Sequence, residues 1–162
     1  MIKIFKKKSN KVIEIVSPVT GKMTNLETVP DKVFASKMMG EGVAFELIEN
    51  TIYSPIEGKV TLIPETKHAI GITGVEGIEI LVHIGLDTVN LKGQGFESLI
   101  KQGDKVFKGT PILKVDIDGL KEQGIELTTP MVITNSGNYE LSIKQIEDVV
   151  AGETLVLECS NK

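Results

Sequence analysis

The chain contains only two histidines, His68 and His83, and both fall in one short stretch with strand-like sequence. Histidine can accept a proton, a metal ion or a phosphoryl group near neutral pH, so a pair of histidines is a candidate for chemistry. The Gly-containing segment 73–78 between them is typical of a hairpin loop. If it forms a six-residue loop, Ile72 faces Glu79 and facing residue numbers sum to 151. His68 then faces His83 on one side of the hairpin, with Cβ atoms roughly 4.5–5.5 Å apart, whereas a shift of one residue separates them.

Two neighbours are placed to orient these imidazoles. Strand side chains alternate between faces, so Thr66 shares a side with His68, and its hydroxyl can fix the tautomer of that imidazole. His83 is embedded in apolar residues. A neutral His83 could donate one ring proton to a backbone carbonyl and keep its second nitrogen free. Gly85 is a suitable acceptor because glycine lets the chain bend back.

Composition restricts the chemistry. All 18 basic side chains are lysine and there is no arginine, so a phosphate-handling site would use lysine, backbone N–H groups, imidazole, or an arginine from a partner. The net charge of −4 gives no reason to expect nucleic-acid binding. The single cysteine, Cys159, and the absence of a signal peptide or of any apolar run near 20 residues predict a cytoplasmic protein.

The rest of the chain predicts an all-β fold, an antiparallel β-sandwich or barrel. Short apolar runs are separated by Gly, Pro, Asn and Asp, and the predicted strands are 11–16, 43–48, 59–63, 78–84, 112–117 and 155–157. Short helical turns are expected at 95–103 and 118–124. Two weak repeats predict duplicated, pseudosymmetric elements: Ser17-Pro18-x-x-Gly21 with Ser54-Pro55-x-x-Gly58, and Val106-x-x-Gly109-x-x-Ile112 with Val149-x-x-Gly152-x-x-Leu155.

The predicted domain organisation is a flexible basic arm, residues 1–12, followed by one domain, residues 13–162. The lysine-rich stretch 1–11 is either a solvated arm or a short segment that touches anionic lipid weakly.

The segment His83-Ile84-Gly85-Leu86-Asp87-Thr88-Val89-x-Leu91-x-Gly93-x-Gly95-Phe96 resembles the glucose-type IIA proteins of the bacterial phosphoenolpyruvate-dependent sugar phosphotransferase system. The resemblance runs from about residue 14 to residue 159. Further matches are the two Ser-Pro-x-x-Gly turns, Val29-Pro30-Asp31-x-Val33-Phe34-Ala35, Glu65-Thr66-x-His68-Ala69 and Thr128-Thr129-Pro130-x-Val132-Ile133-x-Asn135.

This resemblance implies a β-sandwich with two histidines in a shallow apolar depression. His83 would take a phosphoryl group from phospho-HPr on Nε2 and pass it to a cysteine of a sugar-specific IIB domain. His68 would stabilise the transferring phosphoryl group, Thr66 would hold His68, and the Gly85 carbonyl would hold the Nδ1–H of His83.

The resemblance also suggests which residues surround the site. An apolar rim would exclude water and meet partners, and Asp31 and Asp87 would face a basic partner surface. The apolar rim residues are Val33, Phe34, Met38, Met39 and Ile70. Met38 and Met39 are equally compatible with the core, and the two aspartates with ordinary turns. A monomer is the default for a carrier that docks two partners in turn, and regulatory targets are a further possibility.

Three other interpretations stay open. Two imidazoles with Asp87 or Glu79 are half of a zinc centre, but the chain has no third histidine. No obligatory cofactor is therefore expected, although His68 and His83 could share zinc with a partner's carboxylate. Lys37-Met38-Met39 resembles a biotinyl motif, yet Ser36 replaces the preceding methionine and the histidines would be unexplained. A regulatory binding role could use the same face.

Overall fold

Antiparallel strands dominate the structure, a computed structural model that describes residues 11–162. The strands are β1 (Ile13–Val16), β2 (Gly21–Asn25), β3 (Glu41–Leu47), β4 (Thr51–Tyr53), β5 (Gly58–Leu62), β6 (Ala69–Gly74), β7 (Glu79–His83), β8 (Phe96–Ser98), β9 (Lys105–Val106), β10 (Pro111–Val115), β11 (Thr129–Ile133), β12 (Tyr139–Ile143), β13 (Asp148–Val149) and β14 (Leu155–Asn161). The helices are α1 (Lys32–Ala35) and α2 (Ile117–Glu122), with the 3-10 turns η1 (Leu26–Thr28), η2 (Thr88–Leu91) and η3 (Ser136–Asn138).

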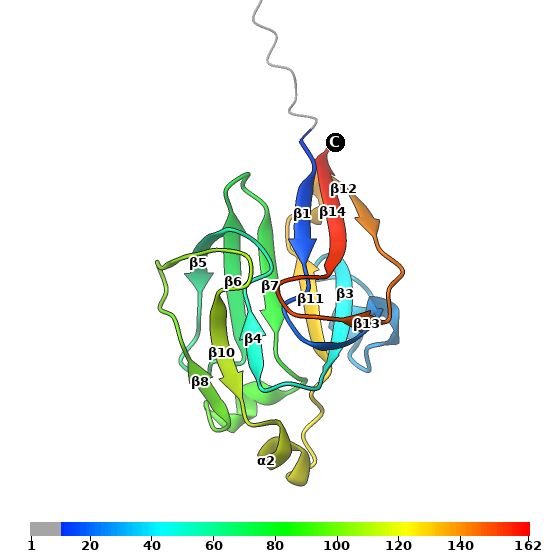
Figure 1. The fold of residues 1–162 in the computed structure, drawn as a ribbon. Coiled ribbons are helices and arrows are strands. Elements are labelled where there is room, and N and C mark those ends of the chain that lie inside the picture. Colours follow the sequence, from blue (N-terminus) through cyan, green and yellow to red (C-terminus); the bar gives the residue numbers. More distant parts are fainter. Residues whose placement is uncertain (1–10) are drawn as a thin grey trace, which may run out of the picture.

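The strands form one large sheet and two small ones, which confirms the predicted all-β class. The large sheet has the order β13-β2-β3-β11-β7-β6-β5-β9, and the small sheets have the orders β1-β14-β12 and β4-β10-β8. In Figure 1, β1, β14 and β12 lie toward the top, and α2 lies at the bottom. The hairpin of β6 and β7 turns at the top, so the other ends of both strands point toward the lower half of the molecule.

The two faces of the large sheet pack differently because strand side chains alternate. On one face, side chains of β6 and β7 pack into the main core, and each of them is at most 2% exposed. These side chains are Ile70, Ile72, Ile80 and Val82. On the other face, the same strands contribute to a smaller cluster that includes Phe34 of α1. Its members are Leu26, Val29, Phe34, Ala44, Ala69, Leu81, Leu86 and Val132. The segment between β2 and β3 therefore covers part of the outer face of the sheet.

The repeated Ser-Pro turns form matching structures, as the sequence predicted. Each serine donates its hydroxyl to the carbonyl two residues later, at 2.6 Å for Ser17 and 2.7 Å for Ser54. Val16 donates its backbone N–H to the Pro55 carbonyl at 3.0 Å, and Tyr53 makes the equivalent bond to the proline of the first turn at 2.8 Å. The two halves of the fold thus meet through reciprocal backbone hydrogen bonds, which is the pseudosymmetry that the repeats indicated.

One of the two predicted helices is wrong. Residues 118–124 do contain helix, as α2, in which the Asp116 side chain accepts the backbone N–H of Gly119 at the N-cap. Segment 95–103 instead contains β8, which pairs with β10. The three-residue length of β8 explains the error, because so short a run shows no clear periodicity.

The predicted arm, residues 1–12, and the predicted lipid contact of 1–11 lie almost wholly outside the described residues. Within the described part, Lys11 forms an ion pair of 3.4 Å with Glu76. None of the helices formed by residues 11–162 has the length and apolar character that crossing a membrane requires.

Candidate functional site

The two imidazoles meet on the outer face of the large sheet. His83 is the last residue of β7, and His68 directly precedes β6. Their ring centroids are 5.1 Å apart, and the planes meet edge to face at 76°. The structure therefore brings together the two residues that the sequence singled out, at the end of the hairpin opposite its loop.

The register that predicted this meeting is wrong by one residue. His83 pairs with Ala69, and the Ile84 N–H donates to the His68 carbonyl at 2.7 Å, so facing residue numbers sum to 152. The loop is shorter than expected because β6 continues to Gly74. A regular strand in this register would send the His68 side chain to the core face. The imidazoles nevertheless meet on the outer face, and the chain departs from strand geometry just before β6, where Lys67 has a φ of 55°.

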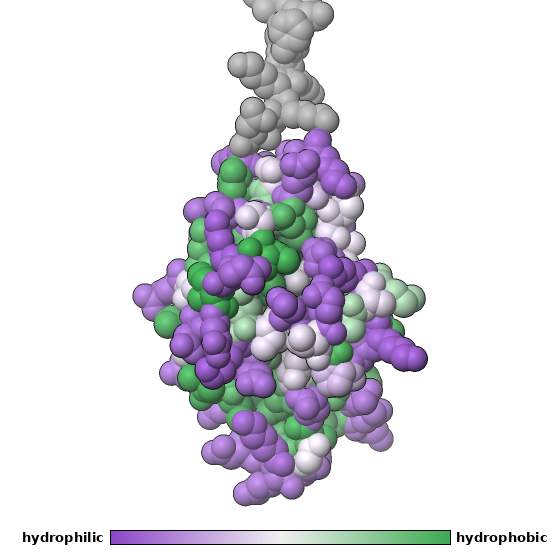
Figure 2. Space-filling view, turned by 90° about the vertical axis from the view of Figure 1, so that its right-hand side faces the viewer, coloured by the Kyte–Doolittle hydropathy of each residue, from purple (hydrophilic) through white to green (hydrophobic). Residues whose placement is uncertain are grey.

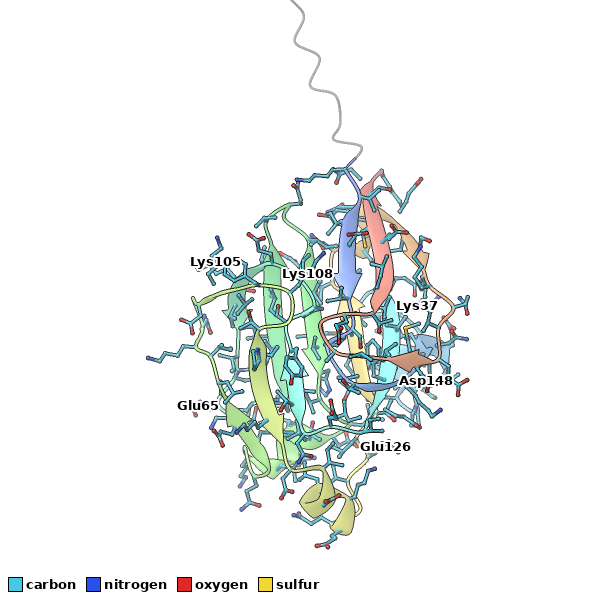
Figure 3. All side chains as sticks on the ribbon, viewed as in Figure 1. Lys37, Glu65, Lys105, Lys108, Glu126 and Asp148 are labelled. Carbon is cyan, nitrogen blue, oxygen red and sulfur yellow. The ribbon has the colours of Figure 1, made fainter. Side chains whose placement is uncertain are left out.

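A chain of hydrogen bonds fixes the tautomer of His83. Its Nδ1 lies 2.8 Å from the carbonyl oxygen of Gly85, which can only accept, so Nδ1 carries the proton and Nε2 of the neutral ring is free. The peptide group after Gly85 is held from its other side, because the Leu86 N–H donates to the Glu126 carbonyl at 2.9 Å. Glu126 lies in the lower part of Figure 3, near α2. The expected hydrogen bond from His83 to the Gly85 carbonyl is thus present, and the Leu86 N–H bond to Glu126 holds that carbonyl in place.

Gly85 needs to be glycine for two reasons. Its φ is +73°, a left-handed conformation that favours glycine. A Cβ atom there would approach Thr88 Cγ2 at 2.6 Å and the Glu126 carbonyl oxygen at 2.8 Å. Thr88 itself is fully buried and donates its hydroxyl to the Ile84 carbonyl at 2.6 Å, which secures the turn after β7.

Thr66 contacts His68 as the sequence suggested. Its hydroxyl lies 2.6 Å from Nδ1 of His68, which leaves Nε2 of that ring available to the site. Both residues belong to the connection between β5 and β6, in which the Lys67 N–H donates to the Pro64 carbonyl at 2.9 Å. Glu65 of this turn lies at the lower left in Figure 3. The turn therefore positions the second imidazole and its partner together.

Both imidazoles favour their neutral forms. Burial lowers the pKa of His83 below its ordinary value of 6.5, and the Gly85 carbonyl, Asp31 and Asp87 offset only part of that effect. The pKa of His68 is lowered first by burial and then by the charge of His83. Neutral rings at pH 7 leave the free Nε2 of His83 able to act as a nucleophile.

The segment around α1 forms one side of the site. Asp31 caps α1 by accepting the Val33 N–H at 2.9 Å, and the Phe34 ring lies 5.0 Å from the His83 ring at an angle of 58°. Phe34 is only 5% exposed, whereas Val33 and Met38 are 43% and 77% exposed. Figure 2 shows hydrophobic patches that reach the surface among hydrophilic side chains on the side of the molecule that lies at the right in Figure 1.

Of the remaining predicted rim residues, two are at the surface and one is buried. Met39 is 36% exposed, and Asp87, at φ 57°, is exposed directly after the His83 turn. Ile70 is wrong as a rim residue, because it points into the main core and is 0% exposed. The error follows from the register between β6 and β7. In the observed register Ala69 faces His83, so Ile70 points to the opposite face of the sheet.

Sequence reasoning missed Leu62 as a surface residue of this face. Leu62 is 46% exposed and pairs with Gly71, where a Cβ atom would lie 3.0 Å from the Leu62 Cβ. Since Gly71 and Ala69 share a face with His83, the apolar surface continues from the site onto β5. The register in which Ala69 and Gly71 share the face of His83 was the signal in the sequence that could have identified Leu62 as a surface residue.

The geometry bears on two alternatives. Among residues 11–162, no group of three or more His, Cys, Asp or Glu residues is arranged to hold a metal ion. His68 and His83 alone would leave zinc incompletely ligated. Lys37 forms ion pairs with Glu27 at 2.9 Å and Glu41 at 3.0 Å, so it does not present a free lysine for a swinging arm.

Comparison with known proteins gives a consistent result. The sequence model of the family described as phosphoenolpyruvate-dependent sugar phosphotransferase system, EIIA 1, matches residues 13–139. A glucose-specific EIIA component from Staphylococcus epidermidis is 44% identical over 153 residues, which cover 94% of this chain and 92% of that protein. A glucoside-specific EIICBA component from Staphylococcus carnosus is 44% identical over 143 residues, which cover 88% of this chain but only 21% of that longer relative. The solved structure of glucose permease IIA from Mycoplasma capricolum superposes with a TM-score of 0.86 at 36% identity, covering 91% of this chain and 96% of that one.

Proposed function

The chain belongs to the EIIA 1 family of the phosphoenolpyruvate-dependent sugar phosphotransferase system, and on that premise we propose that His83 is the residue that carries its phosphoryl group. Members of this family are phosphoryl carriers and act as phosphotransferase components. The observation that supports His83 is the hydrogen bond from Nδ1 to the Gly85 carbonyl, which leaves Nε2 free in a neutral ring. No other imidazole in the chain has this arrangement with a backbone carbonyl two residues later.

Acceptance then needs little from the protein beyond positioning. The Nε2 lone pair of His83 attacks phosphorus, the bond from phosphorus to the donor breaks, and the donor leaves with that electron pair. The positive charge that develops on the ring is shared with the Gly85 carbonyl through the Nδ1–H and is favoured by Asp31 and Asp87. Phe34 and the neighbouring apolar cluster limit the access of water to the same ring.

His68 has the complementary role in this proposal. If the Thr66 hydroxyl donates to Nδ1, the neutral His68 ring carries its proton on Nε2. That N–H can donate to an oxygen of the phosphoryl group on His83, whose ring centroid lies 5.1 Å away. The transferring phosphoryl group carries negative charge on its three equatorial oxygens in the transition state, so a donor placed on one of them stabilises that charge and favours onward transfer.

The family implies interactions with HPr and with a IIB domain. We propose that phospho-HPr is the donor and that a cysteine of a IIB domain is the acceptor. The longer Staphylococcus relative is named an EIICBA component, which combines the A and B units in one protein and supports that acceptor. Because this chain has no arginine, an arginine that stabilises the transition state would come from a partner.

The surface around His83 would form the docking site for both partners. The partners would contact Asp31, Val33, Met38, Met39 and Asp87, with the Phe34 ring beneath them. We propose a cytoplasmic monomer that transfers phosphate without a metal. Zinc could bridge His68 and His83 only with a further ligand from a partner.

The test is intact mass after incubation with phosphoenolpyruvate, enzyme I and HPr, with and without a zinc-selective chelator that leaves Mg²⁺ in solution. We expect a gain of one acid-labile phosphate in the wild type and none in His83→Ala, because the acceptor nitrogen is removed. The chelator should change neither result. Normal labelling of His83→Ala would overturn the assignment.

A further inference from the structure

The position of His68 cannot be explained by the strand that follows it. β6 is in regular register with β7 from Ala69 onward, and the His68 carbonyl accepts the Ile84 N–H at 2.7 Å, as the next rung would require. Continued strand geometry would put the His68 side chain beside Ile70 and Ile84, which are both 0% exposed in the core. The imidazole instead lies against His83 on the outer face.

The departure from strand geometry is located at Lys67. Its φ of 55° is left-handed, a conformation in which non-glycine residues are uncommon and which favours Asn and Asp over lysine. We infer that Lys67 is a positioning residue for phosphoryl transfer: its left-handed backbone turns the His68 imidazole from the core face to His83. This inference rests on the proposed function of the two histidines.

The surrounding structure holds Lys67 in this conformation. On one side, its N–H donates to the Pro64 carbonyl at 2.9 Å, which closes a tight turn. On the other side, the His68 carbonyl is fixed by Ile84. The loop after η2 also packs on this turn, because a Cβ atom on Gly93 would lie 3.4 Å from the Glu65 carbonyl oxygen. A strained residue persists when its neighbours determine its conformation in this way.

The inference concerns the backbone of Lys67 and not its charge, and three variants separate these contributions. Lys67→Asn favours the left-handed conformation and removes the charge. Lys67→Gln keeps a straight side chain and also removes the charge. Lys67→Val introduces a β-branched residue, for which a positive φ is a genuine outlier.

Two readouts are compared across these variants. The first is the nuclear Overhauser contact between the ring protons of His68 and His83, which reports the position of His68 without any phosphoryl transfer. The second is the single-turnover rate from the phosphorylated protein to a IIB domain. We expect Asn and Gln to keep the contact and transfer within about twofold of the wild type, and Val to lose the contact and transfer at least about tenfold more slowly. Labelling of His83 should remain in all three.

The outcomes are distinct. A Val variant with the wild-type ring contact and transfer rate would overturn the inference. Asn and Gln variants that are both as slow as Val would also overturn it, since the lost charge would then be responsible. If Val prevents folding, as judged by circular dichroism, Lys67→Thr, which is also β-branched, replaces it in the same comparison. If the wild type accepts no phosphate, the proposed function fails, but the ring contacts still decide whether Lys67 positions His68.

Discussion

At the scale of single residues, the two imidazoles have the same chemistry but different hydrogen-bond partners. A carbonyl fixes the proton of His83 on Nδ1, whereas a hydroxyl, which can also donate, contacts Nδ1 of His68. The proposed division of labour, with a nucleophile on one ring and a proton donor on the other, follows from this difference. It makes the roles separable by mutation.

His68→Gln should accept phosphate but donate it poorly. Glutamine lacks the imidazole ring that Thr66 holds beside His83, so the Nε2–H donor that stabilises the phosphoryl charge is lost from the transition state, and onward transfer to a IIB domain should slow about 10²-fold. Acceptance on His83 should change much less, because the nucleophile and its Gly85 hydrogen bond remain. Rapid-quench transfer in each direction would measure both steps.

Thr66→Val is the matched control for this prediction, because it removes only the hydroxyl that contacts His68. It should slow onward transfer less than His68→Gln does. Wild-type onward transfer in His68→Gln would show that His68 has a structural role only.

The neutrality of His83 predicts a pH dependence. Burial lowers its folded-state pKa below 6.5, so the unfolded chain binds a proton at a higher pH than the folded protein does. The stability contributed by the neutral ring is complete above pH 6.5 and is lost as pH falls through the folded pKa. Titration of the His83 ring resonances should therefore have a midpoint below 6.5, and phosphoryl acceptance should persist at pH 6.5. A midpoint above 6.5 would contradict burial as the dominant influence.

Residue identities at the site could be predicted because their chemistry is local. Thr66 and Gly85 each lie two positions from the histidine that they contact, so their hydrogen bonds depend little on long-range pairing. Ile70 was wrong because its face depends on the register with β7. Local polar contacts are readable from the sequence, whereas the direction of an apolar strand residue is not when both faces are apolar.

At the scale of elements, the hairpin shows how two errors can cancel. The expected six-residue loop gave the sum 151, and the real loop gives 152, which alone would separate the histidines. The left-handed Lys67 restores the contact. No sequence rule indicates a positive φ at a lysine, so this feature could only be found in the structure.

The duplicated turns give a prediction about stability. Gly152 and Gly124 have nearly the same φ, +75° and +76°. A Cβ on Gly152 would lie 3.0 Å from the Cα of Gly109, the equivalent glycine of the other half, whereas a Cβ on Gly124 would meet nothing within 4 Å. Both alanine variants lose roughly 1–2 kcal/mol from the left-handed backbone. Gly152→Ala should lose at least ~1 kcal/mol more, from overpacking at the pseudosymmetric contact.

Urea unfolding of the two variants would measure this difference in the free energy of unfolding. Equal losses in Gly152→Ala and Gly124→Ala would mean that the two halves separate easily at this point. A Cβ on Gly152 or Gly124 would contact no residue of the site, so labelling of His83 should be unchanged in both variants.

At the scale of the whole molecule, the site is an open surface formed by one face of the large sheet, the α1 segment and the turn after β7. Val33, Met38 and Leu62 expose apolar side chains around it, and Asp31 and Asp87 supply negative charge. A surface of this kind suits a macromolecular donor and acceptor that dock in turn. Because Asp31 and Asp87 place negative charge beside His83, the electrostatic complement of this surface is a basic partner surface.

The double variant Asp31→Asn, Asp87→Asn tests this complementarity. Asparagine caps a helix about as well as aspartate, so α1 should persist while the charge is lost. Association with phospho-HPr should slow roughly two- to tenfold at low salt, because electrostatic steering is weakened, and the salt dependence of the rate should become shallower.

The matched control is Glu140→Gln, Glu153→Gln, which makes the same change in net charge on β12 and on the turn after β13. If the protein's overall charge governs encounter, both double variants slow association equally. If the charges beside His83 govern it, only the aspartate variant does. Stopped-flow transfer at several salt concentrations separates these results, and an aspartate variant as fast as the wild type at low salt would remove both residues from the docking surface. Equal slowing of both double variants would mean that the charge of the whole molecule steers the partner. Slowing of the aspartate variant alone would confine that effect to the face that carries the imidazoles.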